Sequence, residues 1–111
     1  MQAITDEFMQ QMLTKTKTYT FVLLKQNPAY KKEVDHGILW EHARRNFALR
    51  AEGSLNIVAP VAGENNIAGL ALFNKDAKAV KTIMDEDPAV KEGILLYELM
   101  PVRSFPGDSL A

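Results

Sequence analysis

Residues 87–105 read DPAVKEGILLYELMPVRSF, which places an acidic residue directly before a proline and then an apolar strand. Proline disfavours the helical conformation of the residue before it, so we expect Asp87 in extended geometry, just past a helical pattern that ends near Asp85. The apolar run from Ile94 to Met100 predicts a strand over Ile94–Pro101. The Asp87 carboxylate should therefore lie in a loop that opens the last strand of a sheet.

This last strand and the strand predicted over Tyr19–Lys25 are apolar on both faces. In the last strand Leu95, Tyr97 and Leu99 alternate with Ile94, Leu96 and Met100, and none of these six is charged. An antiparallel sheet with one face in water should instead alternate apolar with polar residues. The chain is too short to supply a second covering layer, so the simplest cover is the sheet of a second copy. We expect a homodimer that packs through its sheet faces.

The other patterns complete a ferredoxin-like order. Thr5 is a plausible N-cap for a leading helix, and the strands over 54–60 and 67–73 are joined by turn-forming residues Ala62–Asn66. The expected elements are a helix over Ile4–Leu13, a strand over Tyr19–Lys25, a helix over Ile38–Glu52 ended by Gly53, strands over Ser54–Pro60 and Ile67–Phe73, a helix over Lys75–Asp85 capped by Asn74, and a strand over Ile94–Pro101. This order is an N-terminal helix followed by a βαββαβ antiparallel α+β sheet. We expect one domain over 1–111, with the helix within 1–16 and the core within 18–105.

Composition excludes several classes of function. The net charge of the 111 residues is −1, so no general basic field is available to hold nucleic acid. The chain has no cysteine, which excludes thiolate nucleophiles, disulfides and cysteine-bound metals. Asp6 and Glu7 near the N-terminus do not fit a secretory signal, and no apolar run is long enough for a membrane span. We expect a cytoplasmic protein with no membrane partner.

His42 and Asp87 form a candidate acid–base pair. His42 lies off the apolar stripe of its helix, and its neighbours at helical spacing, Ile38, Arg45, Asn46 and Leu49, form a mixed face able to line a cavity. A carboxylate that orients a histidine fixes its tautomer and lets it move protons near neutral pH without a cofactor. The alternative is a buried hydrogen-bonded pair that only ties a helix to a loop.

The second histidine and the scattered acids do not add a metal site. His36 follows Asp35 at the end of the polar stretch Asn27–His36, which we interpret as a solvated surface loop. Two histidines without the spacing of a helical pair predict no metal centre and no cofactor.

Two blocks of the sequence resemble the YCII-related family of proteins. Residues 41–53, EHARRNFALRAEG, resemble its histidine-led helix, and residues 87–105 resemble its Asp-Pro segment, last strand and basic residue two before Phe. The resemblance covers roughly residues 19–105, and it implies a dimeric α+β barrel with an active-site histidine at His42 and a partnering aspartate at Asp87. One branch of the family looks like dehydrochlorinases of chlorinated hydroxyhydroquinones. The wider superfamily includes lactone isomerases and quinone-forming monooxygenases.

Three further residues are candidates for substrate binding. Arg103 follows the last strand at the position where the family carries a base, and Arg45 lies on the same helix as His42. Either guanidinium can bind a carboxylate or phenolate substrate. Trp40 can stack on an aromatic ligand. The alternative is that the arginines are surface charges and that Trp40, like Tyr97 and Phe47, is core.

We weigh three functions for this sequence. The first is a cofactor-free enzyme that moves protons on a small cyclic or aromatic molecule, with His42 and Asp87 in catalytic roles. The second is a non-enzymatic dimer that binds a small ligand or a protein partner in the same barrel. The third is a haem- or oxygen-dependent monooxygenase of the same superfold. A hydrogen bond between His42 and Asp87 beside an open pocket favours the first, and a sealed pair favours a structural role.

Overall fold

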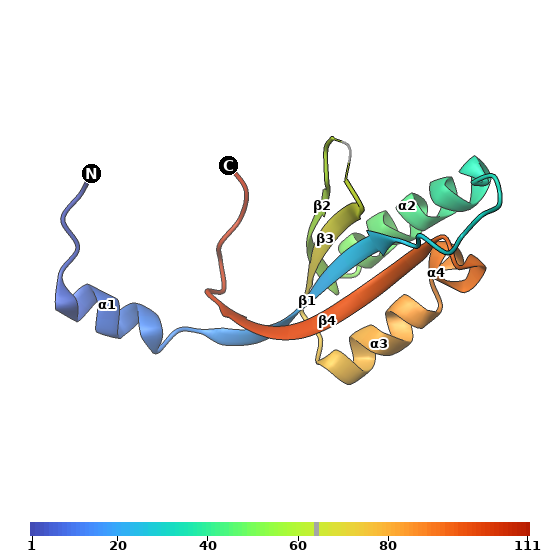
Figure 1. Cartoon of the computed structure of the whole chain (residues 1–111). Coiled ribbons are helices and arrows are strands. Elements are labelled where there is room, and N and C mark those ends of the chain that lie inside the picture. The colour runs from blue at the N-terminus through green and yellow to red at the C-terminus, as the bar shows by residue number, and fades with distance from the viewer. Residues whose placement is uncertain (64) are drawn as a thin grey trace.

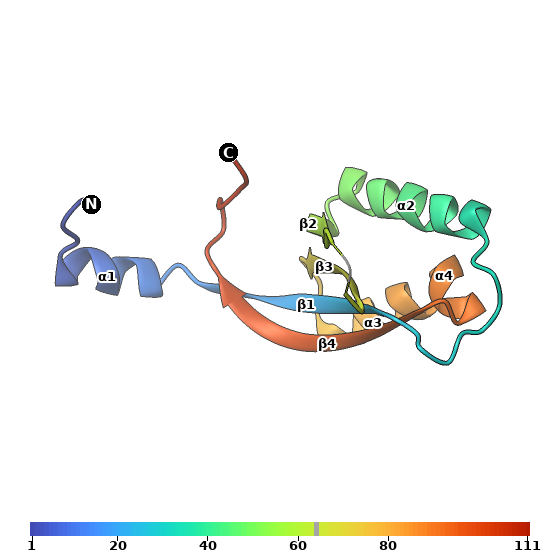
Figure 2. The same cartoon turned by 45° about the horizontal axis from the view of Figure 1, so that its top comes forward.

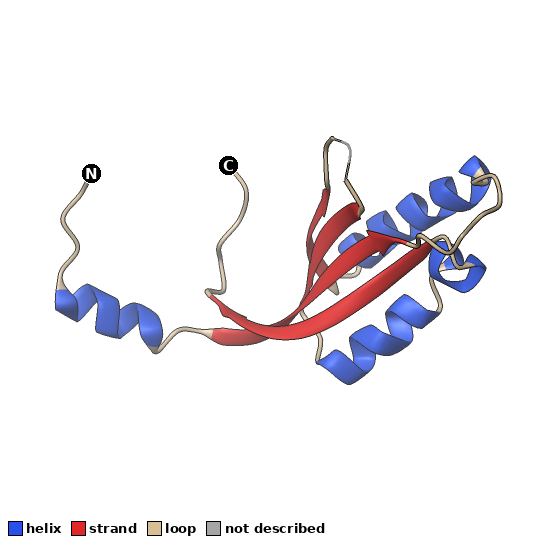
Figure 3. Ribbon diagram, in the orientation of Figure 1, coloured by secondary structure: helices blue, strands red, loops and turns tan. Residues whose placement is uncertain are grey.

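A computed structural model gives the fold, and it describes residues 1–63 and 65–111. Four antiparallel strands form one sheet in the order β2-β3-β1-β4 (Figures 1 and 3). The strands are β1 (Lys17–Gln26), β2 (Leu55–Pro60), β3 (Ile67–Phe73) and β4 (Leu95–Ser104). This order is the ferredoxin-like arrangement that the sequence predicts. Glu64, in the predicted turn between β2 and β3, lies outside the described residues.

Four helices accompany the sheet in the part of the chain that the structure describes. They are α1 (Asp6–Leu13), α2 (His36–Ala51), α3 (Ala77–Asp85) and α4 (Pro88–Glu92). Helices α2, α3 and α4 gather beside the sheet, whereas α1 stands apart from it (Figures 1 and 2). Among the described residues, no helix has both the length and the apolar character that a membrane crossing requires.

The core lies between the sheet and helices α2 and α3. Val22 and Leu24 of β1 are 0% and 5% exposed, and Phe73 of β3 is 1% exposed. They pack in one cluster with Val80 and Met84 of α3, together with Leu49 of α2. Val80 and Met84 are four residues apart, so both side chains lie on the same face of α3, and this face packs into the cluster.

The opposite face of the sheet carries apolar side chains that no element of this chain covers fully. The strand register places Phe21 beside Leu72 and Met100, and Leu23 beside Leu70. Met100 is 39% exposed and Leu70 is 38% exposed. We refer to this surface as the open face. The sequence predicted apolar residues on both sides of the sheet, and the strand register confirms that pattern.

An arm extends from the core at one end of β1 and β4. β1 pairs with β3 only from Thr20 onward, whereas its pairing with β4 begins at Lys17, so a two-stranded ribbon continues beyond the sheet. Helix α1 precedes β1 in the chain and lies beyond the ribbon, and none of its residues is buried. The Thr5 hydroxyl accepts a hydrogen bond from the Phe8 N–H, as the predicted N-cap requires. Figure 2 shows α1 at the far end of this arm.

The two long helices of the core begin at other residues than predicted. Helix α2 starts at His36 and not at Ile38, because the Asp35 side chain accepts the Gly37 N–H and caps the helix. His36 is therefore an exposed residue of the first helical turn and not of a loop. Helix α3 is capped by Asp76 and not by Asn74, since a carboxylate two residues later reaches the Ala79 N–H.

The last segment contains one helix more, and a longer strand, than predicted. Pro88 occupies the first turn of the short helix α4, where its missing N–H has no cost, and Gly93 ends that helix with φ of 86°. Strand β4 continues past Pro101 to Ser104. β4 is an edge strand of the sheet, and a proline there leaves no inner hydrogen bond unmade.

Candidate active site

Asp87 is held in place by the start of helix α4. Its backbone is extended, with φ of −65° and ψ of 132°, as the proline after it predicts. Its Oδ1 accepts hydrogen bonds from the Ala89 N–H at 2.9 Å and the Val90 N–H at 3.3 Å. The side chain is 1% exposed. Because Oδ1 caps α4, Oδ2 is left to face the neighbouring helix α2.

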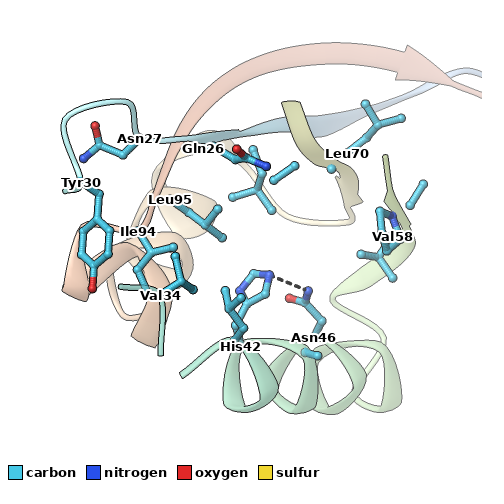
Figure 4. A pocket seen from close by; sticks show the side chains of 17 residues that line it. Gln26, Asn27, Tyr30, Val34, His42, Asn46, Val58, Leu70, Ile94 and Leu95 are labelled. Atoms are coloured by element: carbon cyan, nitrogen blue, oxygen red, sulfur yellow. Dashed lines mark hydrogen bonds between the residues drawn. The ribbon is translucent and has the colours of Figure 1, made fainter. Parts of the chain in front are cut away.

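His42 of α2 meets that second oxygen. His42 Nδ1 lies 2.7 Å from Asp87 Oδ2, and the His42 side chain is 15% exposed. An ionised carboxylate only accepts hydrogen bonds, so the proton of a neutral imidazole resides on Nδ1. Nε2 then carries no proton, and its lone pair faces the Asn46 Nδ2 amide at 3.5 Å (Figure 4). The pair thus fixes both the orientation and the tautomer of the ring.

The environment of Asp87 favours its ionised form. Burial acts to raise the pKa of Asp87, but the hydrogen bond and charge of His42 and the two backbone N–H donors outweigh it. The net result is a pKa below the ordinary value for an aspartate. Arg45 adds a cation nearby, with its Nη1 3.9 Å from Asp87 Oδ2. Asp87 is therefore an anion that accepts hydrogen bonds on both oxygens.

A cavity of about 480 Å³ opens beside His42, between α2 and the sheet (Figure 4). Most of its walls are apolar, and these include Leu24, Val34, Leu39, Val58, Ile94 and Leu95. Its polar side chains are Gln26, Asn27, Tyr30, His42 and Asn46. The His42 imidazole projects into this space, so the pair borders an open pocket and is not sealed inside the core.

The predicted substrate-binding residues do not line this cavity. Arg45 lies beside Asp87 and also 3.8 Å from Glu86, which keeps its guanidinium on the outer side of the pair. Trp40 precedes His42 by two residues on α2, which turns it about 200° away around the helix, and it is 67% exposed. The structure therefore brings Arg45 to the pair, and leaves Trp40 on the outer surface.

Arg103 lies at the other end of β4. Leu95 borders the cavity, and Arg103 is eight residues farther along the strand, or about 26 Å. The Arg103 guanidinium donates through Nε to the Thr16 hydroxyl at 3.1 Å, within the arm. It therefore ties β4 to the segment between α1 and β1 within its own chain.

Sequence reasoning assigned no role to the other polar residues of the cavity. Asn46 was available as a neighbour of His42 at helical spacing, and the i, i+4 relation was the signal for it. Gln26, Asn27 and Tyr30 enter from the end of β1 and the loop after it, and no short-range pattern marks them. Asn27 also supports the loop, since its Nδ2 donates to the Gly93 carbonyl at 2.8 Å.

The acidic and histidine side chains of the described residues form no group of three or more able to hold a metal ion. The polar groups at the site are the His42 imidazole, the buried Asp87 carboxylate, the Tyr30 phenol and three amide side chains.

Comparison with known proteins supports the fold. No family model matches the sequence, and no curated protein matches it. Among solved structures, the chain is similar to the 5-chloro-2-hydroxyhydroquinone dehydrochlorinase from Burkholderia phenoliruptrix AC1100, in complex with 2,5-dihydroxybenzoquinone. The TM-score is 0.53 at 13% sequence identity, and the alignment covers 74% of this chain and 90% of that chain. At this identity the likeness shows a shared ferredoxin-like α+β fold.

Proposed function

We propose that the protein is a small enzyme that performs acid–base chemistry, such as elimination, isomerisation or hydrolysis, on a small cyclic or aromatic molecule. The proposal depends on the 2.7 Å contact between His42 Nδ1 and Asp87 Oδ2 beside an open cavity. His42 acts as the general base or acid, and Asp87 orients it. Proton transfer of this kind uses side chains alone.

The roles follow from the tautomer of the imidazole. With its proton on Nδ1 directed at Asp87, His42 presents the Nε2 lone pair to a bound molecule. When Nε2 takes a proton, the ring becomes a cation whose charge is stabilised by the adjacent carboxylate. Apolar side chains form most of the cavity wall beside the ring, and a surrounding of low polarity strengthens this electrostatic interaction.

The similar solved structure agrees with a ring-shaped substrate. That protein is a dehydrochlorinase and holds 2,5-dihydroxybenzoquinone, an oxygenated six-membered ring. The sequence blocks at 41–53 and 87–105 resemble the YCII-related family, in which His42 and Asp87 match the proposed active-site pair. We infer that the cavity of this chain accepts a ring of comparable size.

We also propose that the protein works as a homodimer in the cytoplasm. The open face carries Phe21, Leu23, Leu70, Leu72 and Met100, and this apolar surface lies on the side of the sheet away from α2 and α3. Two such faces packed together give the dimeric α+β barrel that the family resemblance implies. Association through identical apolar faces produces a closed twofold pair.

Asp87→Asn tests the catalytic role with little change to the fold. The asparagine Oδ1 still accepts the Ala89 and Val90 N–H groups, but its Nδ2 hydrogens now face His42 Nδ1. The ring must then carry its proton on Nε2, so the base is blocked. We expect turnover to fall about 100- to 10,000-fold. Nitrogen-15 shifts of the imidazole report the exchange of tautomers directly.

The assay uses a panel of chlorinated hydroxyhydroquinones, lactones and cyclic ketones, with product analysis by chromatography. His42→Gln should abolish turnover. Asp85→Asn is the matched control, because Asp85 is an acid of similar position in the sequence that pairs with Lys81 outside the cavity. Turnover that survives both active-site changes contradicts the proposal. Binding without any wild-type turnover favours the alternative of a ligand-binding dimer.

A further inference from the structure

An uncharged hydrogen-bond donor lies beside the proposed base. Asn46 follows His42 by one helical turn, and both side chains line the cavity. In Figure 4 the amide and the imidazole project side by side from α2 toward the sheet. A molecule that reaches His42 Nε2 from the cavity therefore also comes within reach of the Asn46 amide.

The contact between the two side chains is weak enough to be exchanged for a ligand. The distance from Asn46 Nδ2 to His42 Nε2 is 3.5 Å, which is long for a hydrogen bond. The amide loses little when it turns from the imidazole to a ligand oxygen. The same movement releases the Nε2 lone pair to accept a proton.

The charge of the cavity limits the class of ligand. Of the described residues that line it, none is lysine or arginine, and His42 is the only histidine among them. The nearest cation to the pair, Arg45, is engaged with Asp87 and Glu86 outside the lining. A permanent anion would lose its hydration on entry without gaining a counter-ion. The cavity is therefore suited to a neutral ring.

We propose that Asn46 binds the oxygen of an uncharged ring compound that carries a carbonyl group, and that it stabilises the charge that develops on this oxygen. The inference rests on the proposed function, because His42 supplies the base. The C–H bond next to the carbonyl breaks and its proton passes to Nε2. The electron pair of that bond forms a carbon–carbon double bond, and the carbonyl π pair moves to the oxygen.

The oxygen then accepts a hydrogen bond from Asn46 Nδ2, as in an oxyanion hole made from an amide side chain. In the isomerisation of a ring ketone that also carries a β,γ carbon–carbon double bond, the enolate is conjugated and His42 returns the same proton to the γ carbon, so no oxidant, reductant or other reactant is consumed. A neutral donor suits this step because its hydrogen bond to the oxygen becomes stronger as negative charge develops there. It does not require the substrate to be charged before the reaction.

Three probes of similar size test the ligand class, namely acetophenone, ethylbenzene and benzoate. Affinities are measured by titration of the amide NMR signals of the cavity residues. We expect the wild type to bind acetophenone about 3- to 10-fold more tightly than ethylbenzene, the ratio that one neutral hydrogen bond supplies. Benzoate should bind more weakly than either. Tighter binding of benzoate, or no binding of any probe, overturns the proposed ligand class.

Asn46→Leu tests the residue itself. The variant should bind acetophenone no better than ethylbenzene, with the affinity for ethylbenzene within twofold of wild type, which also shows that the cavity is intact. Gln26→Leu is the matched control, because Gln26 is an amide across the same cavity (Figure 4), and it should keep the preference for acetophenone. A preference that survives Asn46→Leu overturns the role of Asn46.

Exchange of the acetophenone methyl protons in heavy water separates this inference from the proposed function. Loss of exchange in His42→Gln with unchanged acetophenone affinity supports both. If Asn46→Leu removes the binding preference but wild type catalyses no exchange, Asn46 remains the ligand donor and the catalytic role of His42 fails.

Discussion

Along β1, Val22 and Leu24 face the helices and are buried, whereas Phe21 and Leu23 point to the open face and stay partly exposed. These four neighbouring residues are all apolar, and their alternation places them in two different surroundings. The covered face has its partners within the chain, whereas none of the described elements covers the open face fully. The comparison teaches that apolar residues on both sides of a strand require a covering layer on each face of the sheet. The pattern does not show whether the same chain or another chain supplies the second layer.

The two faces also differ in chemistry. The covered face ends in the cavity where His42 meets Asp87, so buried charge, neutral amides and apolar walls occur together there. Among the described residues, the open face has one ion pair, which joins Lys25 and Glu98. Both of these side chains are in contact with solvent. The proposed catalysis therefore belongs to the covered face, and the proposed assembly belongs to the open face.

The largest effect should come from removing an aromatic ring from the covered face. Phe73→Ala empties a site that is 1% exposed, and we expect the free energy of unfolding to fall by about 3–5 kcal/mol. Phe47→Ala, on the outer surface of α2 where Phe47 is 61% exposed, should change it by less than about 1 kcal/mol. Urea unfolding measures both. Equal losses would mean that Phe47 is buried by a partner.

A charge on the open face should break the proposed dimer and leave the protomer folded. Met100→Lys introduces a cation among Phe21 and its apolar neighbours, and we expect the dimer dissociation constant to rise at least about 100-fold because an unpaired charge becomes buried. Sedimentation equilibrium measures the constant, and circular dichroism checks the fold. Trp40→Lys on the outer surface of α2 is the control. A monomer from Trp40→Lys alone would move the interface to α2.

Acid should remove the contribution of Asp87 to stability. The pKa of Asp87 is lower in the folded protein than in the unfolded chain, so the unfolded chain binds the proton first as the pH falls. The contribution is complete above the ordinary aspartate pKa of about 3.9 and is lost as the pH falls through the folded value. At pH 7 we expect the free energy of unfolding of the wild type to exceed that of Asp87→Asn by about 1 kcal/mol.

This difference should begin to shrink below about pH 4, because the unfolded wild-type chain then takes up a proton at Asp87, and it should be lost once Asp87 is protonated in the folded protein as well. Urea unfolding of the two proteins at pH 7, 5, 4 and 3 isolates it, because all other carboxylates are common to both. A difference that stays constant down to pH 3 would show that Asp87 is not ionised in the fold.

The smallest effect should follow removal of helix α1 and the segment that joins it to β1. Helix α1 has eight residues and buries none of them, and a helix of this length is marginal in water by itself. Deletion of residues 1–16 should therefore change the free energy of unfolding of the core by less than about 1 kcal/mol, because no buried contact is lost. Amide hydrogen exchange should be fast in α1 and slow in β1. Slow exchange in α1 would show that a partner covers it.

Much of the fold was predictable because its determinants are local. Thr5 caps α1 and Pro88 keeps Asp87 extended, as the sequence predicts, and the βαββαβ order is confirmed. The prediction was wrong where two polar residues compete as caps. Asp76 caps α3 in place of Asn74, and that choice depends on which carboxyl or amide oxygen reaches a free N–H.

The site was predictable only in part. His42 and Asp87 were singled out by their positions and by the family resemblance, and the structure brings them together. The amino-acid types of Arg103 and Trp40 do not reveal that these residues lie away from the cavity. Their distance from the cavity follows from the length of β4 and the rotation of α2, which no residue type reveals.

The sequence by itself determined the conformations that depend on near neighbours, including the extended backbone at Asp87, the Thr5 cap of α1 and the alternation along β1 and β4. Only the tertiary structure decided that His42 and Asp87, 45 residues apart, share a 2.7 Å contact, and that Asn46 lies beside them at the cavity. The physical reason is range. Caps and proline act within a few residues, whereas the meeting of side chains in a cavity depends on how α2 packs against the whole sheet.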